Sequence, residues 1–248
     1  MRILVIPCFN EEARLKVTYI DSCIAEADCK VVLVEDGSTD GTLQLLQSIA
    51  ASRASSVTVL ALSKNAGKAE AVRCGILYAF EQHASVVGFC DADFAVLPTD
   101  IARLFKELDS SPNLIGVLGS RIGLLGANIQ RSHFRHYTGR IFASFASIVL
   151  GETIYDSQCG AKVFRHTSIT TKVFSTPFIS RWGFDVELIG RVVKLAKLTG
   201  VAQTVREMPL ESWEERSGSS FTIWRRIKTF TELFAIYQSL KRWPSEMH

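Results

Sequence analysis

Short apolar segments alternate with longer amphipathic segments through the first half of the chain. Each apolar segment predicts a buried strand, and these segments cover residues 3–7, 30–38, 57–62, 86–93 and 114–121. Helical spacing of apolar positions occupies the intervals between them, over residues 10–25, 40–51, 67–82 and 99–108. A strand, helix, strand repeat predicts an α/β fold with a mainly parallel central sheet and helices on both faces.

The pattern changes after Arg121. A glycine-containing loop at 122–130 precedes a long predicted helix near 131–150, and later segments predict a short helix, a helix within 180–197 and a last strand near 201–210. No proline- or serine-rich linker and no internal repeat interrupts the chain, so we expect one domain over residues 1–248. We divide it into halves at 1–121 and 122–220, followed by an amphipathic helix at 221–243.

Polar segments follow the first four predicted strands. They read PCFNEE, EDGSTDGT, NAGKAEAV and DADF, and begin at residues 7, 35, 65 and 91. Parallel sheets of this class bind ligands at the carboxyl ends of their strands. These segments therefore predict one ligand site along that edge of the sheet.

The DADF segment contains two carboxylates, Asp91 and Asp93, at positions i and i+2. On an extended segment such residues point the same way, so both can approach one divalent cation, Mg²⁺ or Mn²⁺, whose open positions suit a diphosphate. A solvated turn is the plainer alternative for an isolated pair. The other polar segments favour the metal interpretation.

Two further segments predict nucleotide contacts. Asp36 can accept hydrogen bonds from a ribose or base, and the N–H groups of the following helix can face an anion. Gly67 permits close backbone approach, and Lys68 offers a positive charge to a phosphate. A capped turn at Asp40 and an ordinary surface lysine are the simpler alternatives.

The ordered motifs resemble one family. VIPCFNEEARL, VEDGSTDGT, NAGKAEAVRCGI, CDADF, GSR, DSQCGAKVF and RWGFDVEL together are similar to family 2 glycosyltransferases of the GT-A fold over about residues 1–220. Within that family the chain resembles the dolichyl-phosphate and polyprenyl-phosphate glycosyltransferases, nearest the dolichyl-phosphate glucosyltransferase branch. The resemblance implies a nucleotide-sugar donor and transfer with inversion.

The resemblance also implies roles for single residues on the donor side. The residues of the donor nucleotide pocket are then Pro7, Asn10, Glu11 and Glu12. Asp36 reads the base or ribose, with Lys68 nearby. Asp91 and Asp93 match the metal-binding motif that bridges the donor diphosphate.

Cationic side chains are expected on the acceptor side. A lipid phosphate is already ionised near neutral pH, so a general base is dispensable and positive charge matters more for positioning. Arg121 is the strongest candidate because it directly follows a predicted strand. The other candidates are Arg135, then Arg131, and Arg140.

Asp185 in RWGFDVEL is an acid among aromatic and apolar residues. In relatives that use a sugar hydroxyl as acceptor a nearby Asp acts as base, so we expect Asp185 to deprotonate or hold the acceptor; a buried helix N-cap is the alternative. Gln158, Gly160 and Lys162 are expected to line the sugar pocket, although Lys162 also fits an exposed strand position.

Composition limits the remaining possibilities. The formal net charge of +3 is too small to indicate a nucleic-acid-binding protein, and scattered cysteines without zinc spacing fit a reducing, cytoplasmic setting. No segment predicts a signal peptide or a membrane span. We expect contact with the cytoplasmic membrane face, if any, to be peripheral.

The predicted C-terminal helix has an apolar stripe with basic residues around it. The stripe contains Trp224, Ile227, Phe230, Phe234, Tyr237 and Leu240. Core packing is the default interpretation of such a stripe, and an in-plane membrane helix is the alternative.

We therefore predict a metal-dependent hexosyltransferase that moves glucose from UDP-glucose onto a polyprenyl phosphate. Alternatives within the class use GDP-mannose or take a sugar hydroxyl as acceptor. An inactive nucleotide-sugar-binding protein is disfavoured because Asp91, Asp93, Arg121 and Asp185 are all present. A nucleotidyltransferase would normally have a glycine-rich basic loop after the first strand, where this chain has PCFNEE.

Overall fold

A seven-stranded sheet in the order β3-β2-β1-β4-β7-β5-β8 forms the centre of the protein. The structure is a computed structural model that describes residues 1–130, 133–181, 183–200, 204–214 and 223–243, with the backbone alone at 133–136, 214 and 223–231. The strands are β1 (Arg2–Cys8), β2 (Lys30–Glu35), β3 (Val57–Ala61), β4 (Val86–Cys90), β5 (Gly116–Ser120), β7 (Ala161–Arg165) and β8 (Val205–Pro209).

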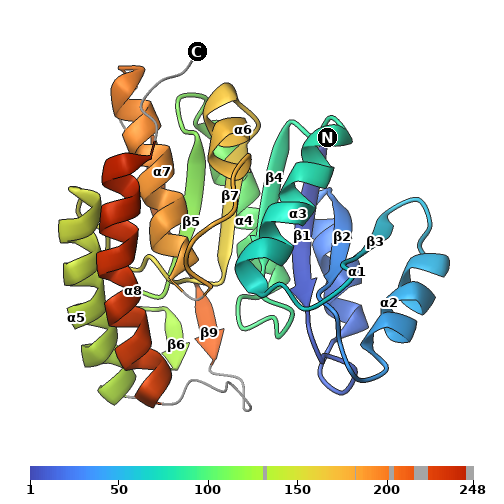
Figure 1. Ribbon diagram of the computed structural model, residues 1–248. Coiled ribbons are helices and arrows are strands. Elements are labelled where there is room, and N and C mark those ends of the chain that lie inside the picture. Colours follow the sequence, from blue (N-terminus) through green and yellow to red (C-terminus); the bar gives the residue numbers. More distant parts are fainter. Residues whose placement is uncertain (131–132, 182, 201–203, 215–222, 244–248) are drawn as a thin grey trace.

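Helices cover both faces of this sheet (Figure 1). On one face, α1 (Val17–Ala27), α2 (Thr42–Ala51) and α4 (Pro98–Ser110) pack into one apolar core. The second core, on the other face, contains α3 (Lys68–Glu81), α5 (His133–Leu150), α6 (Ser168–Phe174), α7 (Phe184–Leu198) and α8 (Ile223–Arg242). The predicted α/β fold is confirmed.

Strand β7 is antiparallel to both of its neighbours, whereas the other pairs in this sheet are parallel. The amino end of β7 therefore lies at the same edge as the carboxyl ends of β1, β2, β4 and β5. In the β4–β7 register Cys90 pairs with Ala161. This register brings the DSQCG segment beside the DADF segment, a contact that crosses the two predicted halves.

Two predicted element boundaries were wrong at this edge. Helix α1 starts at Val17 rather than near residue 10, because the backbone N–H groups of Glu11 and Glu12 donate to Thr42 Oγ1 and hold that segment as a loop. Strand β4 ends at Cys90, so Asp91 and Asp93 lie in a turn rather than on an extended segment. A hydrogen bond from the Phe94 N–H to the Asp91 carbonyl closes this turn at 3.1 Å.

A small second sheet, β6 (Asn128–Gln130) paired with β9 (Ser212–Glu214), was not predicted. Its strands are three residues long, which is too short for a period-two pattern to appear. The six cysteines, all in the described part of the chain, are free.

The described part of α8 packs through a face that only partly matches the predicted stripe. Leu233, Ile236, Leu240 and Trp243 are buried, while Phe234 is 67% exposed. The packing interpretation is thus correct for Leu240 and wrong for Phe234, because the helix is rotated relative to the predicted face. The side chains of Trp224, Ile227 and Phe230 lie outside the described residues. No helix in the described ranges is long and apolar enough to cross a membrane.

Candidate active site

The first two loops of the carboxyl edge are held together by side chains that accept backbone N–H groups. Asn10, which has a left-handed φ of 54°, accepts the Thr39 N–H at its Oδ1 at 2.9 Å. Glu12 Oε2 accepts the Gly41 N–H at 2.9 Å. The structure therefore gives Asn10 and Glu12 a role in shaping the predicted nucleotide pocket, and their contact with a nucleotide stays a prediction.

The third loop is attached to the second through Asp36. Its Oδ1 accepts the Ala66 N–H at 2.7 Å, and its Oδ2 accepts the Gly67 N–H at 2.9 Å. Burial raises the pKa of Asp36, although these two hydrogen bonds oppose the shift. Asp36 thus positions the Gly67–Lys68 segment, and only its remaining lone pairs are available for a ribose or base.

Lys68 and Asp91 form an ion pair in the middle of the edge. Lys68 Nζ lies 2.5 Å from Asp91 Oδ1, and the two side chains are 30% and 36% exposed. Burial by itself would lower the pKa of Lys68, but Asp91, Asp185 and Asp93 outweigh it and hold the pKa above its usual value. This ion pair joins two of the predicted polar segments and remains accessible to solvent.

Glu11 adds a third carboxyl group beside the two aspartates. Its Oε1 accepts Arg14 Nη2 at 2.6 Å, while its buried Oε2 has no hydrogen-bond partner in the part of the chain that the structure describes. Burial raises the pKa of Glu11, and Asp93 and Asp91 raise it further, whereas Arg14 lowers it. Burial and Asp91 likewise raise the pKa of Asp93. The cluster is therefore short of positive charge.

Gly160 explains how Asp91 fits at this edge. A Cβ atom placed on Gly160 would lie 2.4 Å from Asp91 Oδ2, closer than such atoms approach one another. The Asp91 N–H also donates to the Gly160 carbonyl at 3.2 Å. The glycine of the QCGAK segment thus makes room for the first aspartate, and its place in a sugar pocket stays a prediction.

Arg121, the strongest acceptor-side candidate, forms an ion pair with Asp156. Its Nε and Nη2 donate to Asp156 Oδ2 and Oδ1 at 2.6 and 2.7 Å. Burial by itself would lower the pKa of Arg121, but Asp156 outweighs it and raises the pKa. This bidentate geometry fixes the guanidinium plane. Direct contact of Arg121 with an acceptor stays a prediction.

Lys162 and Asp185 form a second ion pair, in the interior. Lys162 Nζ lies 2.6 Å from Asp185 Oδ1, with side chains 0% and 7% exposed, and it also donates to the Cys159 carbonyl at 2.7 Å. The interpretation of Lys162 as an exposed strand residue is wrong, because β7 lies inside the sheet. Asp185 lies in the first turn of α7 and makes no capping hydrogen bond there.

Of the remaining predicted residues, the structure describes the side chains of Pro7, Gln158 and Arg140. Pro7 is half-buried in β1, and Gln158 is half-buried just before β7. Arg140 stacks on Tyr155, with its Cζ 3.9 Å from the ring centroid. Arg131 and the side chain of Arg135 lie outside the described residues.

Sequence reasoning missed three acids that come after Arg121 in the chain. Asp156 pairs with Arg121 across 35 positions, and only its place at the start of DSQCG could have singled it out. Glu187 is fully buried and pairs with Arg191 at 2.7 Å, an i,i+4 spacing that could have predicted the pair. Glu232 of α8 accepts Ser180 Oγ at 2.5 Å, which attaches the last helix to the segment before Asp185.

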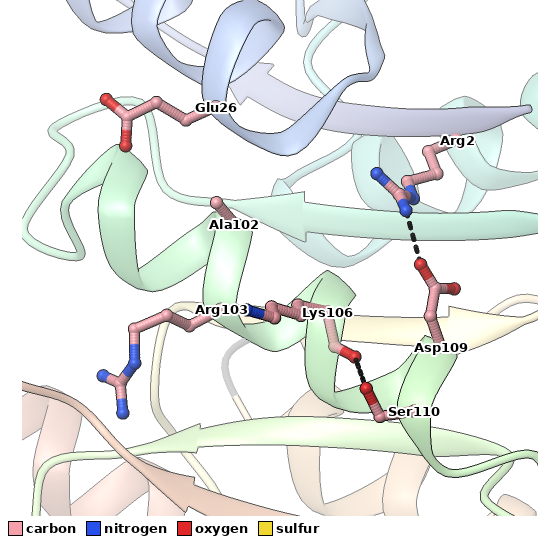
Figure 2. A pocket seen from close by; sticks show the side chains of 7 residues that line it. All are labelled: Arg2, Glu26, Ala102, Arg103, Lys106, Asp109 and Ser110. Atoms are coloured by element: carbon pink, nitrogen blue, oxygen red, sulfur yellow. Dashed lines mark hydrogen bonds and ion pairs between the residues drawn. The ribbon is translucent and has the colours of Figure 1, made fainter.

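A hollow between α1 and α4 lies apart from these residues (Figure 2). Its lining residues are Arg2, Glu26, Ala102, Arg103, Lys106, Asp109 and Ser110. The charges there are already matched in part, since Arg2 pairs with Asp109 and Arg103 pairs with Asp100. None of the predicted site residues lines it, so the carboxyl edge is the candidate active site.

A family model described as glycosyl transferase family 2 matches residues 3–171, a range that contains Lys68, Asp91, Asp93, Arg121 and Lys162. The chain belongs to this family. The glycosyltransferase activity class and the family predicted from the motifs are thereby confirmed.

Two relatives of this family 2 glycosyltransferase are dolichyl-phosphate beta-glucosyltransferases. The one from Drosophila melanogaster is 33% identical over 251 residues, covering 94% of this chain and 73% of the relative. The one from Homo sapiens is 33% identical over 202 residues, covering 75% of this chain and 61% of the relative. The chain thus spans between 61% and 73% of the length of these two relatives.

A solved structure shares the fold. Glucosyl-3-phosphoglycerate synthase from Mycobacterium tuberculosis, in complex with Mn²⁺, UDP and glucosyl-3-phosphoglycerate, superposes with a TM-score of 0.64 at 16% identity, covering 98% of this chain and 80% of that one. The fold is therefore the GT-A fold of glycosyltransferases, as predicted.

Proposed function

We propose that this glycosyltransferase transfers a hexose, glucose from UDP-glucose, to a polyprenyl phosphate with inversion. The names of its two dolichyl-phosphate relatives support this acceptor class. The proposal rests mainly on the ion pair of Asp185, whose Oδ1 lies 2.6 Å from the buried Lys162 ammonium. A carboxylate held in this way is poorly placed to remove a proton from a sugar hydroxyl. A phosphate acceptor needs no such base.

A divalent cation fits the residues at the carboxyl edge. The buried Glu11 Oε2 has no hydrogen-bond partner among the described residues, and the negative charges of the half-buried Asp91 and Asp93 act on this carboxyl group. Asp91 and Asp93 would hold the ion, because hard cations prefer carboxylate oxygens. When bound, Mg²⁺ or Mn²⁺ would neutralise charge on the diphosphate leaving group.

The chain's own residues supply the rest of the proposed reaction. Because its side chain is 30% exposed, Lys68 can release the Asp91 carboxylate and bind an oxygen of the donor phosphate instead. An oxygen of the acceptor phosphate forms a bond to the anomeric carbon as the bond to the nucleoside diphosphate breaks. Because the acceptor oxygen is already ionised, no proton has to be removed before attack.

The decisive experiment is an isotope-labelled transfer assay with a panel of donors and acceptors. We expect label from UDP-glucose to appear on polyprenyl phosphate, with little transfer from GDP-mannose and none to free sugars. Transfer to a sugar hydroxyl in preference to the lipid phosphate would overturn the acceptor assignment. Preference for GDP-mannose would overturn the donor assignment alone.

Peripheral attachment to the cytoplasmic face of a membrane belongs to the same proposal. Its support is the lipid nature of the proposed acceptor and the five basic residues between Trp224 and Trp243, against a single acid. We expect the purified protein to float with anionic liposomes at low salt. If it stayed unbound under those conditions, the attachment would be rejected without affecting the transfer reaction.

A further inference from the structure

Arg181 comes from the second half of the chain and contacts the third loop of the carboxyl edge. Its Nη2 donates to Asn65 Oδ1 at 3.1 Å, across 116 positions of the sequence. A Cβ atom placed on Gly67 would lie 2.7 Å from Arg181 Nε, 3.0 Å from its Nη2 and 3.3 Å from its Cζ. The guanidinium of Arg181 therefore fills the space that a side chain at position 67 would need.

The positive charge of Arg181 is not matched by an ion pair. The side chain is exposed, and no carboxylate of the described residues forms an ion pair with it, whereas Lys68 is paired with Asp91. Burial raises the pKa of Asp36, and the charge of Arg181 opposes that shift together with two backbone N–H groups. Both oxygens of Asp36 already accept those N–H groups. A guanidinium has five N–H groups, so most of those of Arg181 are available to a ligand.

The backbone that carries Arg181 is held on both sides. Glu187 Oε2 accepts the N–H groups of Ile179 and Ser180 at 3.0 and 3.4 Å. On the other side, Ser180 Oγ accepts the Gly183 N–H at 2.6 Å. Glu187 is fully buried, so water does not compete for these hydrogen bonds. A side chain on a backbone fixed in this way loses less conformational freedom when it binds a ligand.

The guanidinium of Arg181 lies next to the proposed cation site. Gly67 directly precedes Lys68, whose Nζ lies 2.5 Å from Asp91 Oδ1. A bound diphosphate adds about two negative charges to those of Asp91 and Asp93, and a divalent cation with Lys68 offsets roughly three of these four. One more cation at this point balances the charges, and Arg181 is an exposed cation that borders Gly67.

We propose that Arg181 binds the diphosphate of the nucleotide-sugar donor while its guanidinium rests against Gly67. This inference rests on the proposed function, because it names a further residue for the donor of that reaction. Guanidinium N–H groups bind phosphate oxygens in pairs, and such charge-assisted hydrogen bonds are stronger than neutral ones. The second half of the chain then holds the donor directly, and Gly67 is required because a side chain there would displace the guanidinium.

Binding of UDP and of uridine in the presence of Mg²⁺ tests the inference, because only UDP carries the diphosphate. We expect Arg181→Gln to bind UDP about tenfold more weakly, and uridine as the unchanged protein does. Arg181→Lys keeps the charge without the planar fork, so its affinity for UDP should be intermediate. Calorimetry measures UDP binding, and an NMR titration measures the weaker binding of uridine.

Lys30→Gln is the matched control. It removes one exposed positive charge at the amino end of β2, which is the opposite edge of the sheet. UDP affinity should therefore stay unchanged in this variant. The urea unfolding midpoint of Arg181→Gln should equal that of the unchanged protein, because the replaced side chain is exposed.

Several results would overturn the inference. Unchanged UDP affinity of Arg181→Gln would do so, as would an equal loss in Lys30→Gln. An equal loss of uridine affinity in Arg181→Gln would assign the contact to the nucleoside and reject the diphosphate. Failure of the unchanged protein to bind any nucleoside diphosphate would also reject it.

The proposed function fails in a different way. A protein that binds GDP in place of UDP changes the donor of the reaction, and the effect of Arg181→Gln is then measured with GDP and guanosine. Because binding is measured without acceptor, absence of glucose transfer would reject the proposed reaction and leave the result for Arg181 standing.

Discussion

Two lysine–aspartate ion pairs at the carboxyl edge have nearly the same length and different surroundings. Lys68 Nζ lies 2.5 Å from Asp91 Oδ1, with side chains 30% and 36% exposed. Lys162 Nζ lies 2.6 Å from Asp185 Oδ1, with side chains 0% and 7% exposed. Water screens the first pair and can replace either partner, whereas the second is shielded from water and its ammonium also donates to the Cys159 carbonyl.

We predict that the accessible pair takes part in the reaction and that the buried pair supports the fold. The open pair, Lys68–Asp91, joins the first residue of α3 to the turn after β4, and an incoming diphosphate or cation can change its partners. The closed pair, Lys162–Asp185, ties β7 to the start of α7 and stays together in every step that we propose. Similar charges at similar distances therefore do different work, and burial decides which.

The largest expected effect on turnover comes from replacing Asp91 or Asp93. Asp91→Ala and Asp93→Ala should each lower turnover by at least about a thousandfold, because charge on the leaving diphosphate is no longer matched. Folding should change little, since both side chains are half-exposed. Label transfer from UDP-glucose measures the first quantity and urea unfolding the second.

Glu26→Ala is the control for these two variants, because Glu26 is an exposed acid on α1 that does not belong to the cluster. EDTA should abolish turnover of the unchanged protein, and added Mg²⁺ or Mn²⁺ should restore it. Full turnover of both aspartate variants in EDTA would remove the metal assignment.

The closed pair should show its effect in stability. Lys162→Met leaves the Asp185 carboxylate buried without a partner, so we expect the free energy of unfolding to fall by about 3–5 kcal/mol. The double variant Lys162→Met/Asp185→Leu should recover most of that loss, because it removes both charges. Urea denaturation followed by circular dichroism measures all three proteins. An unchanged unfolding midpoint for Lys162→Met would mean that the pair is hydrated in solution.

Gly160 lies between the two pairs and tests how tightly they are packed. A Cβ at this position would be 2.4 Å from Asp91 Oδ2, so Gly160→Ala should displace the carboxylate and lower turnover by about a hundredfold. The accompanying loss of stability should be about 1–3 kcal/mol. Gly123→Ala is the matched control, because nothing lies within 4 Å of a Cβ there. Equal turnover of Gly160→Ala and Gly123→Ala would contradict the close approach of Gly160 to the Asp91 carboxylate.

The smallest expected effect on stability is that of Lys68→Met. A half-exposed ion pair contributes little, so the free energy of unfolding should change by less than about 1 kcal/mol. The KM for the nucleotide-sugar should nevertheless rise, since the positive charge at the donor site is lost. A stability loss as large as that of Lys162→Met would erase the distinction between open and closed pairs.

The nucleotide half was more predictable than the acceptor half for a physical reason. Asp36 directly follows β2 and Glu12 lies in the loop after β1, and their oxygens accept N–H groups of the adjacent loop. Parallel strands bring such loops to one edge of the sheet, whichever other contacts the chain forms. In the acceptor half the pairs join distant segments, as Arg121 and Asp156 do across 35 positions. No spacing rule predicts a contact of that kind.

By itself, the sequence determined the α/β fold, the family and the edge of the sheet at which the polar segments gather, because apolar periodicity and residues next to strand ends are local properties. Only the tertiary structure decided that β7 runs antiparallel between β4 and β5, and that Arg121 and Asp185 already have partners. Those facts depend on which segments meet and how much water they exclude, and both are properties of the assembled fold.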